Sequence, residues 1–139
     1  MRIDVCDAES GELLEREELH NLVTLAGRNL IRDLLNEATD SGLTHFAVGG
    51  NDTAVAAGDT QLGGEIYRDT LTKRTATDGV LTLTYFLPSG AANGSTLKEA
   101  GLFNAATGGV LFARAVFGAI AKTSSVTVTY TWNITIGAS

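Results

Sequence analysis

Hydrophobic and polar residues alternate without a break from Val126 to Ile136. The apolar positions of this segment are Val126, Val128, Tyr130, Trp132, Ile134 and Ile136. A side-chain period of two predicts a strand with one buried face, and β-branched and aromatic residues favour such a strand. We therefore expect this segment to contribute more to the core than any other.

Residues 1–18 predict an acidic N-terminal hairpin or arm. Met1 to Cys6 alternates between apolar and polar residues, Asp7 to Gly11 is rich in turn-forming residues, and Glu12 to Leu19 can return as the second strand. The acidic side chains of the second strand suit the edge of a sheet, because charged edges discourage unwanted pairing.

The following segment predicts one α-helix, over about residues 24–37. Its apolar residues recur at three- and four-residue spacing: Leu22, Ala26, Leu30, Ile31, Leu34 and Leu35. Thr24 is a suitable N-cap, and the polar stretch from Asn36 to Gly42 is expected to end the helix.

The rest of the chain predicts strands joined by short turns. The expected elements are a strand at 43–48, a loop with one helical turn at 59–62, a long polar strand at 65–77, and strands at 80–87, 96–104 and 110–117. Asp78-Gly79 predicts a two-residue hairpin turn, because both central residues of that turn need positive φ. The chain is thus mainly β: we expect a single domain over 1–139, an antiparallel β-sandwich or barrel (19–139) with one helix.

All of the net charge of −6 lies in residues 1–40, where ten acidic residues face four arginines. The other 99 residues carry six acids and six bases. This distribution argues against nucleic acid as a partner, because phosphate binding needs clustered Lys and Arg. We expect no membrane partner either, since no run of eighteen apolar residues occurs and the charged N-terminus does not resemble a signal peptide.

The sequence contains no recognisable catalytic, cofactor-binding or metal-ligating group, and we expect no enzymatic activity. His20, His45 and Cys6 each lack the neighbouring ligands that a zinc site requires. Glu17-Glu18 has no apolar pocket to raise a carboxyl pKa, and Gly49 to Asp52 lacks the Lys-Ser/Thr pair of a phosphate loop, so we interpret it as a turn. With one cysteine, no intrachain disulfide can form.

Several stretches, in order, carry a family resemblance. They are His20 to Val23, Leu43 to Gly49, Glu65 to Arg68, Leu97 to Asn104, Gly109 to Arg114 and Lys122 to Ser125. Together they resemble small virion proteins of tailed bacteriophages and the N-terminal domain of phage tail-collar fibre proteins. In the stretch Glu99 to Phe103, Gly101 is expected where a side chain would collide, and Leu102 and Phe103 are expected on opposite sides of a strand.

The resemblance implies a non-enzymatic structural protein of a virion, assembled in the host cytoplasm. Its partners would be other virion proteins and further copies of itself. Because a fibre would continue into a shaft whereas this sequence stops at Ser139, we favour a capsid-decorating (cement) subunit; the alternative is a tail or baseplate adaptor that anchors a fibre. The expected docking surfaces are the acidic 1–18 hairpin and the polar 65–77 strand.

A carbohydrate-binding module remains an alternative from another class. Such a module would need exposed aromatic residues flanked by polar groups. Trp132 and Tyr130 instead share their face with Val and Ile, which predicts that both lie in the core.

Overall fold

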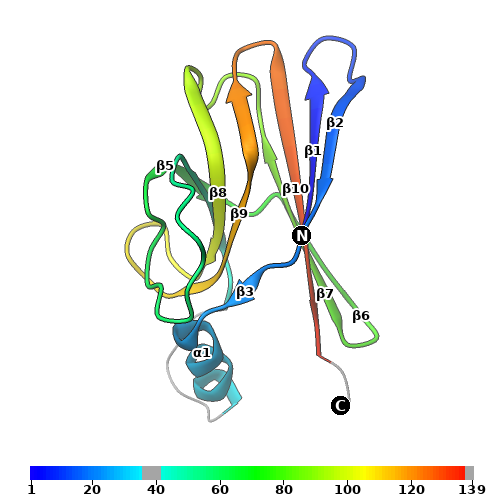
Figure 1. The fold of residues 1–139 in the computed structure, drawn as a ribbon. Helices are drawn as coiled ribbons and strands as arrows, with labels where there is room; N and C mark the ends of the chain where they lie inside the picture. The colour runs from blue at the N-terminus through cyan, green and yellow to red at the C-terminus, as the bar shows by residue number, and fades with distance from the viewer. Residues whose placement is uncertain (36–41, 137–139) are drawn as a thin grey trace.

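The computed structural model describes residues 1–35 and 42–136, which form two five-stranded antiparallel sheets and one helix. The sheets face each other, and the helix lies at one end of the sandwich (Figure 1). This arrangement confirms the predicted β-sandwich with a single helix.

Sheet A has the strand order β2-β1-β10-β7-β6. Its strands are β1 (Arg2–Asp7), β2 (Leu13–Glu18), β6 (Lys73–Thr77), β7 (Val80–Leu87) and β10 (Val126–Thr135). The predicted first hairpin is confirmed as β1 and β2, and β2 lies at the edge, as its acidic side chains indicated. The alternating C-terminal segment is the central strand of this sheet.

Sheet B has the order β3-β9-β8-β4-β5. Its strands are β3 (Leu22–Val23), β4 (His45–Gly49), β5 (Glu65–Thr70), β8 (Ser95–Phe103) and β9 (Leu111–Lys122). β9 extends five residues beyond the predicted end at Phe117, into a segment that we had expected only to connect two strands.

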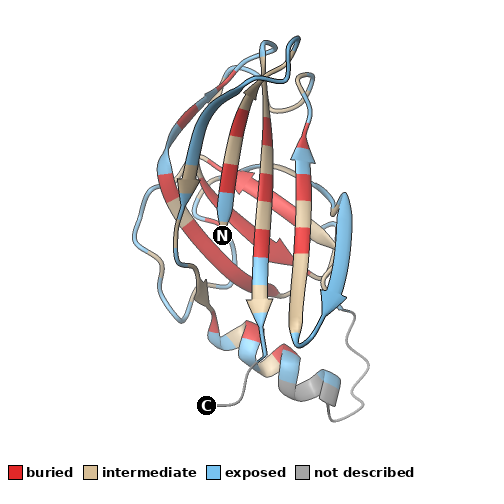
Figure 2. Ribbon diagram, turned by 90° about the vertical axis from the view of Figure 1, so that its right-hand side faces the viewer, coloured by how far each residue is buried: buried red, intermediate tan, exposed pale blue. Residues whose placement is uncertain are grey.

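The core between the sheets follows from the alternation of β10. Val128, Tyr130 and Trp132 are completely buried, and Phe46 of the opposite sheet contacts both rings, with centroid distances of 4.9 Å to Tyr130 and 6.2 Å to Trp132. Figure 2 shows buried residues alternating along the central strands of sheet A and exposed residues along its sides. The prediction was wrong at the end of the segment, where Ile136 is 75% exposed.

A second, smaller apolar cluster covers the outer face of sheet B. It consists of Ala47, Leu62, Phe103 and Leu111. Leu102 belongs to the main core and Phe103 to this cluster, which confirms that they lie on opposite sides of β8. A Cβ at Gly101 would come within 2.8 Å of Leu111 and 2.9 Å of Leu62, so the expected close approach is also confirmed.

The helix α1 runs from Leu25 to Leu35, and the expected cap is confirmed because Thr24 Oγ1 accepts a 2.9 Å hydrogen bond from Gly27 N. The predicted apolar face is only partly buried. Leu30 is buried, but Ile31 and Leu34 are exposed, because α1 covers one end of the sandwich and not a full sheet face. The expected helix end at 36–37 lies outside the described residues.

Two predictions for residues 59–77 were wrong. The helical turn at 59–62 does not form, because the Asp59 carboxylate binds Ala56 N and the Arg114 guanidinium instead. The long polar strand divides at Leu71 and Thr72: β5 belongs to sheet B and β6 to sheet A. Leu71 N donates to Thr44 O of one sheet and Thr72 N to Thr84 O of the other, so the chain crosses between the sheets here.

Candidate interaction surfaces

The two expected docking segments form exposed edges of the sandwich. In β2, every residue is exposed except the half-buried Glu17, and in β6 all five residues are exposed. Within the described residues, β2 pairs only with β1, and β6 only with β7. Sheet A therefore presents backbone N–H and C=O groups to solvent along both of its sides.

The two edges of sheet A differ in charge. β2 contains Glu15, Glu17 and Glu18 against Arg16, which donates to Asp4 of the neighbouring strand at 2.5 Å. β6 contains Lys73 and Arg74 and no acidic residue. The first edge is thus acidic and the second is basic.

One glutamate of the acidic edge also links the two sheets. The Glu17 carboxylate accepts a hydrogen bond from Gly118 N of β9, with distances of 3.2 and 3.4 Å to its two oxygens. Glu17 is therefore partly a structural residue, whereas Glu15 and Glu18 are exposed and available to a partner.

A buried charged cluster holds the loop over residues 50–64 against sheet B. Glu99 has no exposed surface, and its carboxylate accepts hydrogen bonds from Arg114 Nε at 2.8 Å, Gly64 N at 2.7 Å and Gly63 N at 3.0 Å. Arg114 also donates to Asp59 at 3.0 Å and to Thr53 O at 3.1 Å. Each buried charge is thus paired, as burial of a charge requires.

Sequence reasoning missed this cluster, although Glu99 and Arg114 both lie in strands that were expected, at 96–104 and 110–117. Glu99 and Arg114 are separated by 15 residues, and nothing in their spacing indicates a pair. The signal that could have found them is a charged residue at a position within an otherwise apolar strand pattern. The cluster fixes Leu62 over Phe103 and so closes the outer apolar cluster.

An apolar groove lies between α1 and the adjacent end of sheet A, with a volume of about 380 Å³. Its walls include Ile31 and Leu34 of the helix and Leu81, Ile134 and Ile136 of the sheet side. Arg74 of the basic edge reaches its rim and donates to Leu43 O at 2.9 Å. Apart from Arg74, every residue that lines this groove is apolar or glycine.

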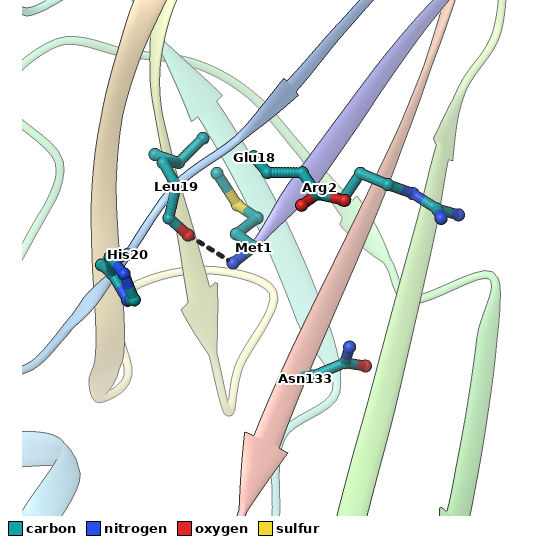
Figure 3. A pocket seen from close by; sticks show the side chains of 6 residues that line it. All are labelled: Met1, Arg2, Glu18, Leu19, His20 and Asn133. Atoms are coloured by element: carbon teal, nitrogen blue, oxygen red, sulfur yellow. Dashed lines mark hydrogen bonds between the residues drawn. The ribbon is translucent and has the colours of Figure 1, made fainter.

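A polar hollow surrounds the first amino group (Figure 3). The Met1 ammonium donates to Leu19 O at 2.7 Å, and Arg2, Glu18, His20 and Asn133 line the hollow. Partial burial lowers the pKa of this amino group, and the nearby Glu18 carboxylate opposes the change. Most of the side chains that line this hollow are polar or charged.

The structure keeps the histidines and the cysteine apart. His20 borders the polar hollow, His45 Nδ1 lies 2.8 Å from Thr44 Oγ1 at the start of β4, and Cys6 is a half-buried free thiol. In residues 1–35 and 42–136 no three His, Cys, Asp or Glu residues are grouped as metal ligands. Over the same residues, no helix has the length and apolar character needed to cross a membrane.

Comparison with known proteins identifies no relative: no family model, curated protein or solved structure matches the chain.

Proposed function

We propose that the protein is a non-enzymatic structural subunit of a tailed-bacteriophage virion, and that it decorates the capsid surface. The observation that carries the proposal is the exposure of both charged edges of sheet A on a well-packed sandwich. Exposed strand edges recruit other protein strands, and charge selects which ones. The resemblance of the sequence stretches described above supplies the class of particle.

The packing of the sandwich supports this role over carbohydrate binding. Trp132 and Tyr130, whose exposure would favour a sugar-binding face, are completely buried. The side chains that do face solvent on sheet A's edges are mostly charged or hydroxylated, which suits contacts with a protein surface.

The test is quantitative mass spectrometry of gradient-purified particles from a tailed phage whose genome carries this sequence. We expect many copies per particle, comparable in number with the major capsid protein. A few copies per particle would instead assign the protein to the tail or baseplate, as a fibre adaptor. Absence from the particles, or binding to defined sugars on a glycan array, would contradict the proposal.

The same assay tests the acidic edge. Replacing Glu15, Glu17 and Glu18 by Gln should reduce incorporation into particles, because the edge loses its negative charge. The amide oxygen of the new side chain at position 17 can still accept the hydrogen bond from Gly118 N. The matched control replaces Glu9 and Glu12, exposed acids of the turn outside β2, by Gln. Equal incorporation of both variants and the parent would show that the acidic edge does not dock.

A further inference from the structure

The two sides of sheet A have complementary properties. The acidic edge strand β2 and the basic edge strand β6 are of similar length, six and five residues, and both are exposed. Lys73 and Arg74 on one side match Glu15 and Glu18 on the other in number and are opposite in sign. A sheet with one acidic and one basic free edge is complementary to another copy of itself.

We propose that β2 of one copy pairs with β6 of the next, so that sheet A continues from copy to copy in head-to-tail order. The inference deepens the proposed function, since it names a second copy of the chain as the partner of both edges. Each new contact combines strand addition, in which backbone hydrogen bonds supply affinity, with pairing of opposite charges.

The strand directions determine how the copies join. Four successive antiparallel pairings separate β2 from β6, so both strands run in the same direction. When copies follow one another in one orientation, β2 and β6 therefore meet as a parallel pair.

Charge disfavours the two-fold alternatives. A β2–β2 contact would bring the glutamates of two copies together, and a β6–β6 contact would do the same with Lys73 and Arg74. Like charges opposite each other destabilise a strand pair. A head-to-tail contact, in contrast, leaves one free edge on every new copy and produces a ring or a helical array.

The register of sheet A specifies how the two edges overlap in that array. Arg2 pairs with Glu18 and Thr131, and Thr84 pairs with Thr131 and Lys73. Glu18 and Lys73 therefore lie at the same level of the sheet. From that level, β2 and β6 extend in opposite directions along the strands.

Because the β1–β2 pair has a bulge at Val5 and Cys6, the six residues of β2 span only four steps of the ladder. Full overlap of β2 with β6 then shifts each copy by about four residues, roughly 13 Å, along the strands. In this register Arg74 of one copy lies beside Glu15 of its neighbour.

The edges of sheet B are less suitable for this contact. β3 has only two residues, and beyond it Gly118 N of β9 already donates to the Glu17 carboxylate. In β5, the Arg68 guanidinium is already bound to Glu65 at 2.6 Å and to the carbonyls of Ala105 and Gly108 at 3.0 and 2.8 Å, and it lies 3.6 Å over the ring of Phe103. Its charge is therefore committed within the chain.

The test uses charge exchange in the full chain, followed by native mass spectrometry and light scattering. One variant carries Glu15→Lys and Glu18→Lys, so both of its edges are basic; the other carries Lys73→Glu and Arg74→Glu, so both are acidic. The parent should associate at low salt and dissociate at about 1 M salt, where charges are screened beyond about 3 Å. Each variant alone should associate at least about tenfold more weakly than the parent, because like charges then meet across the interface.

An equimolar mixture of the two variants should recover the association of the parent, because each basic edge again meets an acidic one, in alternating order. A two-fold contact through β2 alone would instead be unaffected in the Lys73→Glu and Arg74→Glu variant, because that variant leaves β2 unchanged. If Arg74→Glu impairs folding through loss of the Leu43 contact, Lys73→Glu with Thr75→Glu replaces it. Each of three outcomes would overturn the inference. The folded mixture could stay monomeric, the single variants could associate like the parent, or the parent itself could be monomeric at low salt.

These outcomes are separable from those of the proposed function. A chain that is monomeric in solution yet abundant in purified particles would overturn the edge pairing and leave the virion role intact. A chain that pairs through its edges but is absent from particles would do the reverse.

Discussion

The hydroxyl group of Tyr130 is buried inside the sandwich. The residue has no exposed surface, and its hydroxyl oxygen contacts no hydrogen-bond partner in the described part of the chain. Burial raises the pKa of the Tyr130 phenol above its ordinary value of 10, with a smaller contribution from Tyr85 nearby. The folded protein therefore holds this phenol in its neutral form.

We predict that this tyrosine makes the fold sensitive to alkali. Below about pH 10 the phenol is neutral in both the folded and the unfolded chain, so it does not affect how stability depends on pH. Above that pH the phenol ionises in the unfolded chain but not in the folded chain. The free energy of unfolding therefore falls by up to about 1.4 kcal/mol per pH unit for each such residue. Tyr130→Phe should reduce this fall, measured by denaturant titrations between about pH 8 and about pH 11.

The matched control is Tyr67→Phe, because Tyr67 is only half-buried and its hydroxyl donates to Asp69 at 3.3 Å. It should change the alkaline fall less than Tyr130→Phe does. An unchanged alkaline fall in Tyr130→Phe would mean that the Tyr130 hydroxyl reaches solvent.

At the scale of elements, the loop over residues 50–64 depends on one arginine. Arg114 on β9 joins Glu99 on β8 to Asp59 and Thr53 O in the loop. Removing one member of a buried ion pair leaves the other charge buried without its partner, which is more costly than losing an exposed pair.

Arg114→Met should therefore lower the free energy of unfolding by about 3–5 kcal/mol. It should also make the loop a site of early cleavage in limited proteolysis. Lys98→Met is the matched control, since Lys98 forms an exposed pair with Asp52 at 2.9 Å, worth about 1 kcal/mol or less. Equal stability losses in the two variants would contradict the anchoring role of Arg114.

The same elements show which features a sequence can predict. Alternation identified β10 and β7, and Asp78 and Gly79 form the expected turn with φ of 47° and 77°. These features are local, because a strand's period and a turn's φ depend on adjacent residues. The division of residues 65–77 between two sheets was not predicted. A polar edge strand has no apolar face, so its sequence does not indicate which sheet it joins.

The candidate surfaces were predictable to a similar extent. The acidic character of β2 and its edge position followed from composition and pattern. The pairing of Glu99 with Arg114, the apolar groove beside α1 and the position of β6 opposite β2 depend on the register and order of strands distant in sequence. Periodicity contains no information about that order.

At the scale of the whole molecule, two surfaces are candidates for binding a partner. The charged edges of sheet A expose backbone groups, and the groove between α1 and sheet A exposes Ile31, Leu34 and Ile136. A second copy of the chain can bind at these edges, because the acidic β2 of one copy complements the basic β6 of the other. We therefore expect the contacts between copies at β2 and β6 and not at α1.

Amide hydrogen exchange, followed by mass spectrometry, tests this placement most directly. The parent chain is compared at low salt, where we expect it to be assembled, and at high salt, where we expect it to be dissociated, at matched temperature and pH. We expect assembly to slow exchange in peptides that cover β2 and β6, with little change in β3 and β5. Slower exchange confined to α1 and the strands of the groove, with β2 and β6 unchanged, would contradict this placement.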